Sequence, residues 1–265
     1  MACCRPPYWL TLLTILLSLT CSSVLSDEED TLRLLKFKSS LSNTEELNWN
    51  VTSPPCDGIK ENWKGVICDN DGIVFGLVLE NMGLSGVIDM DTLSEITTIR
   101  TLSFVNNSFM GSMPNLEKML PLRGIFLSYN KFSGEIGGDA FSGMSSLRKV
   151  ELRNNAFTGK IPVSLTQLPF LMDLELQNNE FDGQIPDFEQ KLLTVNFSNN
   201  RLDGFIPKGL SNQDPNSFAG NNLCGEPLSP CKISNSNGSG SSDTSSSRIF
   251  SMCTCFITIL RLWYL

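Results

Sequence analysis

The chain has 265 residues, a formal net charge of −8 at pH 7 and no histidine. Without histidine, the commonest general base, the Ser-His-Asp and Cys-His constellations and most zinc sites are excluded. The sequence also lacks a Gly-rich phosphate loop followed by Lys and the protein-kinase catalytic motifs. We therefore expect no enzyme activity, no metal and no cofactor. The acidic composition argues against nucleic-acid binding and favours basic partners.

Residues 1–26 have the layout of a secretory signal peptide. Arg5 gives a short positive region, residues 9–19 are apolar, and small residues follow over 21–26. The apolar run is too short for a comfortable membrane span, so we expect cleavage near Ser26. The remaining chain is then expected in the secretory pathway, at the plasma membrane surface or outside the cell.

Residues 27–72 are predicted to form an N-terminal cap. Their first part carries acids in its first turn, as suits the dipole of a helix, and Trp63 is expected to be a structural plug over the first coil. The apolar positions of the predicted amphipathic helix are Leu32, Leu34, Leu35, Phe37 and Leu41.

Residues 73–210 repeat one template six times, and the clearest copy is LRKVELRNNAFTGKIP over 147–162. Val150 and Leu152 alternate there with charged residues, the pattern of a short strand with one buried face. Successive copies start 21 to 25 residues apart, which is the period of leucine-rich repeats, whereas an ordinary β-rich domain has no fixed period. We predict an α/β repeat solenoid with short parallel strands on its concave face. The copies start at Val74, Ile99, Leu122, Leu147, Leu171 and Leu192.

An asparagine recurs just after each predicted strand. Its side-chain amide can hydrogen-bond neighbouring backbone groups, and in register on adjacent coils it forms a ladder that pairs otherwise unpaired amides and carbonyls. The column comprises Asn107, Asn130, Asn155, Asn179 and Asn200, with Met82 in its place in the first repeat.

Four cysteines fall into two local pairs that flank the repeats, Cys56 with Cys68 and Cys224 with Cys231. One pair precedes the repeats and the other follows them, where an open solenoid would expose its core. We interpret both pairs as disulfides that close the caps, the second cap extending over 211–231. The alternative is four unrelated buried thiols.

The composition changes beyond the second cap. Residues 232–247 are mostly Ser, Asn and Gly and are predicted to form a flexible spacer. The hydrophobic tail over 248–265 has an apolar run of about 12 residues, short of the roughly 20 that cross a bilayer. Three interpretations stay open, and membrane association with them: the read-through end of a truncated product, a weakly hydrophobic anchor, or a lipid-anchor signal after residues 245–247.

The cap motifs P-P-C over 54–56, W-x-G-V-x-C over 63–68 and SFAGNNLCGEPL over 217–228 resemble those of the extracellular domain of plant leucine-rich repeat receptor-like kinases. The third is one residue shorter than the family pattern. LENMGLSGVIDMDTL over 79–93, RTLSFVNNSFMGSMP over 100–114 and the segment over 137–162 are similar to the pollen receptor-like kinase subfamily. The resemblance covers residues 27–231 and implies a plant-type leucine-rich repeat fold with disulfide-closed caps.

The resemblance further implies a pollen-tube cell-surface receptor that senses secreted peptides or proteins, often cysteine-rich, with a co-receptor as a further candidate partner. A family member continues through a membrane helix into a kinase-like domain, which this sequence lacks. We therefore expect the ligand-binding ectodomain in a kinase-less receptor-like or truncated form. The alternative function is a secreted, wall-associated structural or inhibitory leucine-rich repeat protein.

The variable strand positions of such repeats lie on the concave sheet, which these folds use for recognition. Repeats four and five are rich in charge there, and a basic ligand would suit their acids. The alternative is that these charges merely pair across neighbouring strands and keep the sheet soluble. The candidate ligand-binding residues are Phe126, Lys149, Glu151, Arg153, Asp173, Glu175 and Gln177.

Four N-glycosylation sequons occur, at Asn50, Asn106, Asn196 and Asn237. Asn196 lies between two apolar positions of the sixth strand, so a glycan there would stand on the concave face and compete with a ligand. Asn237 lies in the predicted spacer.

Overall fold

The structure, a computed structural model, describes residues 28–231. The predicted signal peptide, the spacer over 232–247, the tail over 248–265 and the sequon at Asn237 lie outside the described residues. Within 28–231 no helix is long and apolar enough to cross a membrane. The same residues contain no cluster of Cys, Asp or Glu side chains that could hold a metal ion.

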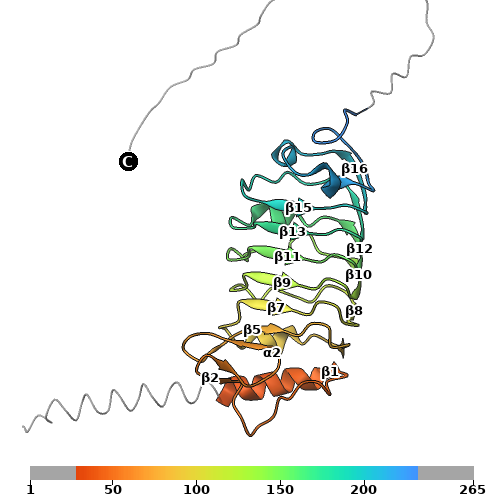
Figure 1. Cartoon of the computed structure of the whole chain (residues 1–265). Helices are drawn as coiled ribbons and strands as arrows, with labels where there is room; N and C mark the ends of the chain where they lie inside the picture. Colours follow the sequence, from red (N-terminus) through yellow and green to blue (C-terminus); the bar gives the residue numbers. More distant parts are fainter. Residues whose placement is uncertain (1–27, 232–265) are drawn as a thin grey trace, which may run out of the picture. The chain divides into compact units, whose positions relative to one another are not determined.

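Each of the six repeats contributes one short strand to a main sheet (Figure 1). These strands run parallel, and β4 (Val66–Cys68) from the N-terminal cap pairs antiparallel with the first of them. The predicted repeat solenoid is confirmed. The repeat strands are β5 (Val74–Val78), β7 (Thr101–Ser103), β9 (Gly124–Phe126), β11 (Lys149–Glu151), β13 (Asp173–Glu175) and β15 (Thr194–Asn196).

The sixth repeat departs from the template at its first position. Leu193 is buried there, whereas Leu192, which the template places in the core, is 77% exposed. Thr194 pairs with Asp173, so the strand itself is in the expected register. This repeat starts only 21 residues after the fifth, and its shorter connection turns the chain inward one residue later.

A second parallel sheet follows the asparagine column, and Figure 1 shows it along the other side of the coils from the main sheet. The template does not predict it. Four ladder asparagines are followed two positions later by a phenylalanine: Phe109, Phe132, Phe157 and Phe181 stack at successive centroid distances of 6.3, 6.0 and 6.2 Å. The strands are β8 (Met110–Gly111), β10 (Lys131–Glu135), β12 (Ala156–Lys160), β14 (Glu180–Gly183), β16 (Arg201–Phe205) and β17 (Asn222–Cys224).

Gly159 shows why the template needs glycine in this second sheet. Its φ is +75°, which side-chain-bearing residues rarely adopt. A Cβ on Gly159 would also lie 2.7 Å from Cγ of Glu135 on the neighbouring strand. Glycine therefore lets adjacent coils approach closely enough for the phenylalanine rings to stack.

The asparagine ladder forms as predicted. Nδ2 of Asn155 donates to the carbonyls of Leu127 and Leu152, each at 3.0 Å, and its Oδ1 accepts from the backbone N–H of Phe132 at 3.1 Å. In the first repeat, the backbone N–H of Met82 donates to Oδ1 of Asn107. Equivalent bonds are made by Asn107, Asn130, Asn179 and Asn200.

The ladder runs one coil further than the template. Asn221, in the C-terminal cap, donates to the carbonyls of Phe197 and Phe218 and accepts from the backbone N–H of Leu202. Strand β17, which follows Asn221, pairs with β16. The C-terminal cap therefore begins as a partial seventh coil.

The residue before each ladder position adopts a left-handed backbone conformation, which asparagine tolerates better than most residues. This explains the repeated Asn-Asn doublets, because the first asparagine makes the turn and the second joins the ladder. Within the six repeats, Tyr129 is the one residue of this column that is not asparagine. The residues and their φ values are Asn81 (59°), Asn106 (54°), Tyr129 (58°), Asn154 (54°), Asn178 (57°) and Asn199 (55°).

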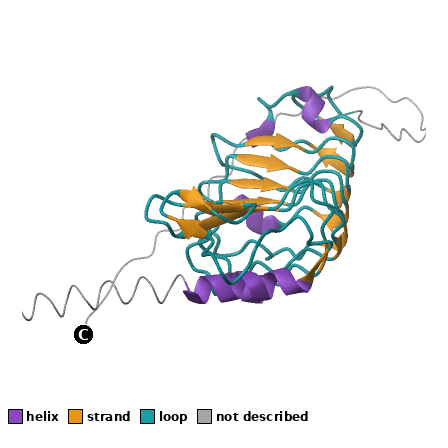
Figure 2. Cartoon of the chain, turned by 60° about the horizontal axis from the view of Figure 1, so that its bottom comes forward, coloured by secondary structure: helices purple, strands orange, loops and turns teal. Residues whose placement is uncertain are grey.

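A helix over residues 28–40 covers the first coil (Figure 2). Leu34 and Phe37 are fully buried against the core. Leu32, which the amphipathic pattern assigns to the buried face, is 58% exposed, so the buried stripe is narrower than expected. Trp63 is buried, and its ring centroid lies 5.4 Å from that of Trp49 in a stacked arrangement. This packing agrees with the structural role expected for Trp63.

Disulfides join Cys56 to Cys68 and Cys224 to Cys231, as expected from the sequence. The connections on the far side of the coils include short helices and, over 119–122 and 139–144, hydrogen-bonded turns. The remaining elements are β1 (Leu41–Ser42), β2 (Cys56–Asp57), β3 (Lys60–Glu61), β6 (Ser85–Gly86), α2 (Met90–Ser94), η1 (Val163–Gln167), η2 (Lys208–Leu210) and η3 (Pro215–Phe218).

Replacing Asn155 by Leu is expected to lower the free energy of unfolding, because the backbone N–H of Phe132 loses its partner. The carbonyls of Leu127 and Leu152 lose one of two side-chain donors and keep Asn130 and Asn179 respectively. The cost is about 1 to 3 kcal/mol for each group left unpaired. Urea denaturation of the purified chain measures it. The neighbouring Asn154→Gly variant is the control, since glycine suits its left-handed backbone, and should stay within about 0.5 kcal/mol. Equal stability of Asn155→Leu and the parent chain would contradict a structural ladder.

Replacing Cys56 and Cys68 together by Ser is expected to lower the free energy of unfolding by about 2 to 5 kcal/mol. The corresponding Cys224 and Cys231 double variant should lose less, because that bond closes a loop of sequence separation 7 and the first bond one of 12. Denaturation curves of both variants test the order. Non-reducing peptide mapping that found free thiols or crossed linkages would contradict the pairing itself.

Candidate ligand-binding surface on the main sheet

Side chains that alternate with the core residues form regular columns across the main sheet. Strand pairing places Phe126 beside Glu151 and Glu151 beside Glu175. Gly124 leaves room for the Phe126 ring, because a Cβ there would lie 2.6 Å from a ring carbon. The middle column reads Val78, Ser103, Phe126, Glu151, Glu175 and Asn196.

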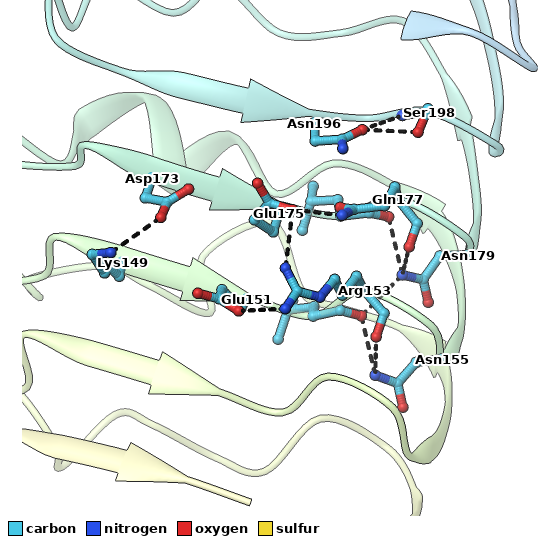
Figure 3. A network of polar contacts seen from close by, with 12 residues as sticks. Lys149, Glu151, Arg153, Asn155, Asp173, Glu175, Gln177, Asn179, Asn196 and Ser198 are labelled. Carbon is cyan, nitrogen blue, oxygen red and sulfur yellow. Dashed lines mark hydrogen bonds and ion pairs between the residues drawn. The ribbon is translucent and has the colours of Figure 1, made fainter. Parts of the chain in front are cut away.

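Six of the seven predicted binding residues come together on β11, β13 and the positions just after them (Figure 3). The first group is one ion pair, from Nζ of Lys149 to Oδ2 of Asp173 at 3.3 Å. The second is centred on Arg153, whose guanidinium lies 3.4 Å from Glu151 and 3.3 Å from Glu175. Nε2 of Gln177 donates to Glu175 in addition. Phe126 contributes no polar contact and adjoins the network only through its strand.

We call Lys149, Glu151, Arg153, Asp173, Glu175 and Gln177 the acidic network. Its charges pair across neighbouring strands, as one interpretation of the sequence anticipates. Three carboxylates nevertheless face two cations, so one negative charge is left over. The pairs hold the carboxylates on rigid strands, and the surplus lets the surface attract a cation.

Tyr129 belongs beside this network, although sequence reasoning missed it. The Arg153 guanidinium lies over the Tyr129 ring, 5.7 Å from its centroid, a cation–π arrangement. Tyr129 occupies the left-handed column and is 48% exposed. The signal was present in the sequence, because Tyr-Asn replaces the Asn-Asn doublet in the third repeat.

Burial raises the pKa of the Glu151 carboxyl above its ordinary value of 4.5. The Arg153 guanidinium opposes this shift in the pKa, whereas the carboxylates of Asp173 and Glu175 add to it. The carboxyl of Glu151 therefore keeps its proton to a higher pH in the folded chain than an ordinary glutamate does.

The sequons within the described residues differ in their surroundings. Asn50 and Asn106 are exposed, and Asn196 is half-buried on the main sheet. Oδ1 of Asn196 accepts from the N–H and the hydroxyl of Ser198, at 3.1 and 2.8 Å. Modification at each of these sites stays a prediction.

Replacing Glu151 by Gln is expected to change how stability depends on pH. Because the pKa of Glu151 is higher in the folded chain than in the unfolded chain, the folded chain binds more protons just above pH 4.5. The parent's free energy of unfolding therefore falls as the pH rises from 4.5 through the raised pKa. The stability of Glu151→Gln minus that of the parent should therefore increase from pH 4.5 upward and then level off. Urea denaturation across this range measures the difference, and a decreasing difference would contradict the raised pKa.

Stacked coils with two parallel sheets, an asparagine ladder and disulfide-closed caps define a plant-type leucine-rich repeat domain. The sequence matches the leucine rich repeat N-terminal domain over residues 27–69 and leucine rich repeat families over 121–181 and 191–213. Pollen receptor-like kinase 4 of Arabidopsis thaliana is 49% identical over 212 residues, which are 79% of this chain and 30% of the relative.

Solved structures agree with this classification. A crystal structure of a pollen receptor kinase 3 matches with a TM-score of 0.64 and 38% identity, over 68% of this chain and 88% of that chain. The BIR3–SERK2 complex from Arabidopsis thaliana matches with a TM-score of 0.54 and 26% identity, over 77% of this chain and 100% of that chain. The chain belongs to the pollen receptor-like kinase family. It spans about 30% of the length of the curated relatives that it matches, the part that carries the repeats.

Proposed function

We propose that residues 28–231 are the ligand-recognition domain of a pollen-type receptor and that the acidic network binds a basic secreted peptide or protein. The observation that carries this proposal is the surplus carboxylate charge on β11 and β13. Charges on rigid strands cost little to order when a ligand arrives. They also steer an oppositely charged partner and select against like-charged ones.

Phe126 and Tyr129 add apolar contact area beside the charges. Phe126 is half-buried on β9, and Tyr129 is 48% exposed next to Arg153. Aromatic residues next to charged groups are typical of binding hot spots. A basic ligand, disulfide-folded if it is cysteine-rich, would place its cations on the acidic network and an apolar side chain on these rings.

Recognition, and not catalysis, is the role that we assign to this chain. The two disulfides within residues 28–231 suit the oxidising environment of the cell surface or the extracellular space. One of the similar solved structures is a complex of two proteins, BIR3 and SERK2. We infer that a co-receptor is a second partner, and that a kinase-less or truncated form would bind ligand without signalling itself.

Reversing Glu151, Asp173 and Glu175 to Lys is expected to abolish or strongly weaken binding of a basic secreted peptide and to flatten its salt dependence. The reason is that the reversal removes the attraction and adds repulsion. Calorimetric titration of a panel of basic, disulfide-folded secreted peptides measures this. The milder Glu151→Gln, Asp173→Asn, Glu175→Gln variant keeps the side-chain shapes and should weaken binding less.

The matched control reverses three exposed acids of the second sheet, Glu135, Asp182 and Asp203, to Lys. It has the same change in charge and should do little. Equal losses from both sets would mean that total charge governs association, and the binding residues would then have to be sought over 212–231. Binding of wall polygalacturonases in place of every peptide would favour the wall-associated alternative.

A further inference from the structure

A hollow of about 320 Å³ lies at the other end of the strands from Arg153, where the chain enters β13 and β15. Three large apolar side chains line it and are exposed: Phe170 by 59%, Met172 by 44% and Leu192 by 77%. Arg148 and Lys191 also line it. Apolar side chains exposed together around a concavity, with polar residues at the rim, are typical of interaction sites.

The backbone around this hollow is held in place by hydrogen bonds. The N–H of Met172 donates to the carbonyl of Arg148, and the N–H of Thr194 to the carbonyl of Met172, both at 2.9 Å. Nε2 of Gln190 fixes the connection before β15, because it donates to three carbonyls of the preceding coil at 3.0 to 3.1 Å. The hollow is therefore preformed, which lowers the ordering cost of binding.

The outward position of Leu192 follows from the short sixth repeat. The chain turns inward at Leu193, so Leu192 is left on the surface beside Met172 and Phe170. Packing within the repeats does not require an exposed leucine here.

The charge around the hollow is positive, in contrast to the chain's net charge of −8. Arg148 and its neighbour Arg123 on the preceding coil are exposed, and neither they nor Lys191 make an ion pair with any described residue. No carboxylate lines the hollow. Asp187 and Glu189 lie on the same connection but outside the lining.

We propose that this surface, the basic edge, docks an acidic segment of a partner protein that inserts one large apolar side chain into the hollow. The basic edge comprises Arg123, Arg148, Phe170, Met172, Lys191 and Leu192. Flanking carboxylates of the partner pair with Arg148 and Lys191, and arginine can hold a carboxylate through two parallel hydrogen bonds. The proposal does not rest on ligand binding at the acidic network, which calls for the opposite charge.

The charge also argues against a second copy of this chain as the occupant. A two-fold symmetric dimer centred on the basic edge would place Arg148 opposite its own equivalent. Contact of the basic edge with the acidic network of another copy, whether reciprocal in a two-fold dimer or head-to-tail, would occupy both charged surfaces at once. An acidic segment of a different protein satisfies the charges in a single contact.

Three synthetic peptides of equal length test the proposal: an acidic peptide with a central Leu, the same peptide with Ser in place of the Leu, and a basic peptide with the Leu. Fluorescence anisotropy measures their binding to the full chain as secreted. The acidic Leu peptide should bind best, and the Ser peptide about tenfold more weakly. Arg148→Glu and Leu192→Ser should each weaken the acidic Leu peptide by about tenfold or more.

The control variants are Lys160→Glu, on the second sheet, and Val163→Ser, an exposed apolar residue that does not line the hollow. Both should bind the acidic Leu peptide like the parent, and the Glu151→Gln, Asp173→Asn, Glu175→Gln variant should bind it no more weakly than the parent. Because Leu192 is exposed, its variant should unfold at the parental temperature. If the Leu192 variant unfolds at a lower temperature, Met172→Gln tests the apolar lining of the same hollow.

Three outcomes would overturn the proposal. The first is no binding of the acidic Leu peptide, or binding that the basic or Ser peptide equals. The second is an equal loss in Lys160→Glu and Arg148→Glu. The third is concentration-dependent self-association of the parent in analytical ultracentrifugation that Arg148→Glu abolishes, which would assign the basic edge to a second copy.

Discussion

After each main-sheet strand the backbone turns, and the amides and carbonyls at that turn are shielded from water by the neighbouring coils. They need hydrogen-bond partners within the protein. The ladder asparagines supply these partners, and the positions of the surface side chains depend on the resulting order of the coils. Asn155 ties Leu127, Phe132 and Leu152 together across two coils. The coil spacing that results lets the phenylalanine rings stack and keeps the main-sheet strands in register. Glu151 and Glu175 are side by side because the backbone beneath them has no freedom to shift.

Much of the fold could be predicted because the same sequence pattern occurs in all six repeats. Period-two alternation defines the main strands, and the asparagine column predicts the ladder. The second sheet could not be predicted, since its residues are largely exposed and its pairing depends on backbone groups that no side-chain pattern reports. Leu192 was misplaced because it lies three residues before Val195, as the template requires, and the template does not account for the shorter connection of the sixth repeat. Asn221 was missed because no strand template precedes it.

The candidate ligand-binding surface could likewise be predicted only in part. Alternation places Lys149, Glu151 and Arg153 on one face, so their proximity to the next strand followed from the sequence. Which charges pair depends on side-chain conformations that the sequence does not state. Tyr129 was overlooked because it reaches the network from a turn. The hollow of the basic edge escaped notice because its lining joins the segments 169–172 and 190–192, which meet only in the folded chain.

The two surfaces carry charge of opposite sign on the same rigid coils. Figure 3 shows the Lys149–Asp173 ion pair at the start of the strands, between the Arg153 cluster and the residues that enter the strands. This pair belongs to the acidic network and does not line the hollow of the basic edge. The ladder holds the coils between the two surfaces through hydrogen bonds, so we expect their mutual influence to be mainly electrostatic. Salt screens such an influence within about 10 Å at 0.1 M ionic strength. Two oppositely charged partners can therefore occupy neighbouring surfaces of one recognition domain without competing for the same residues.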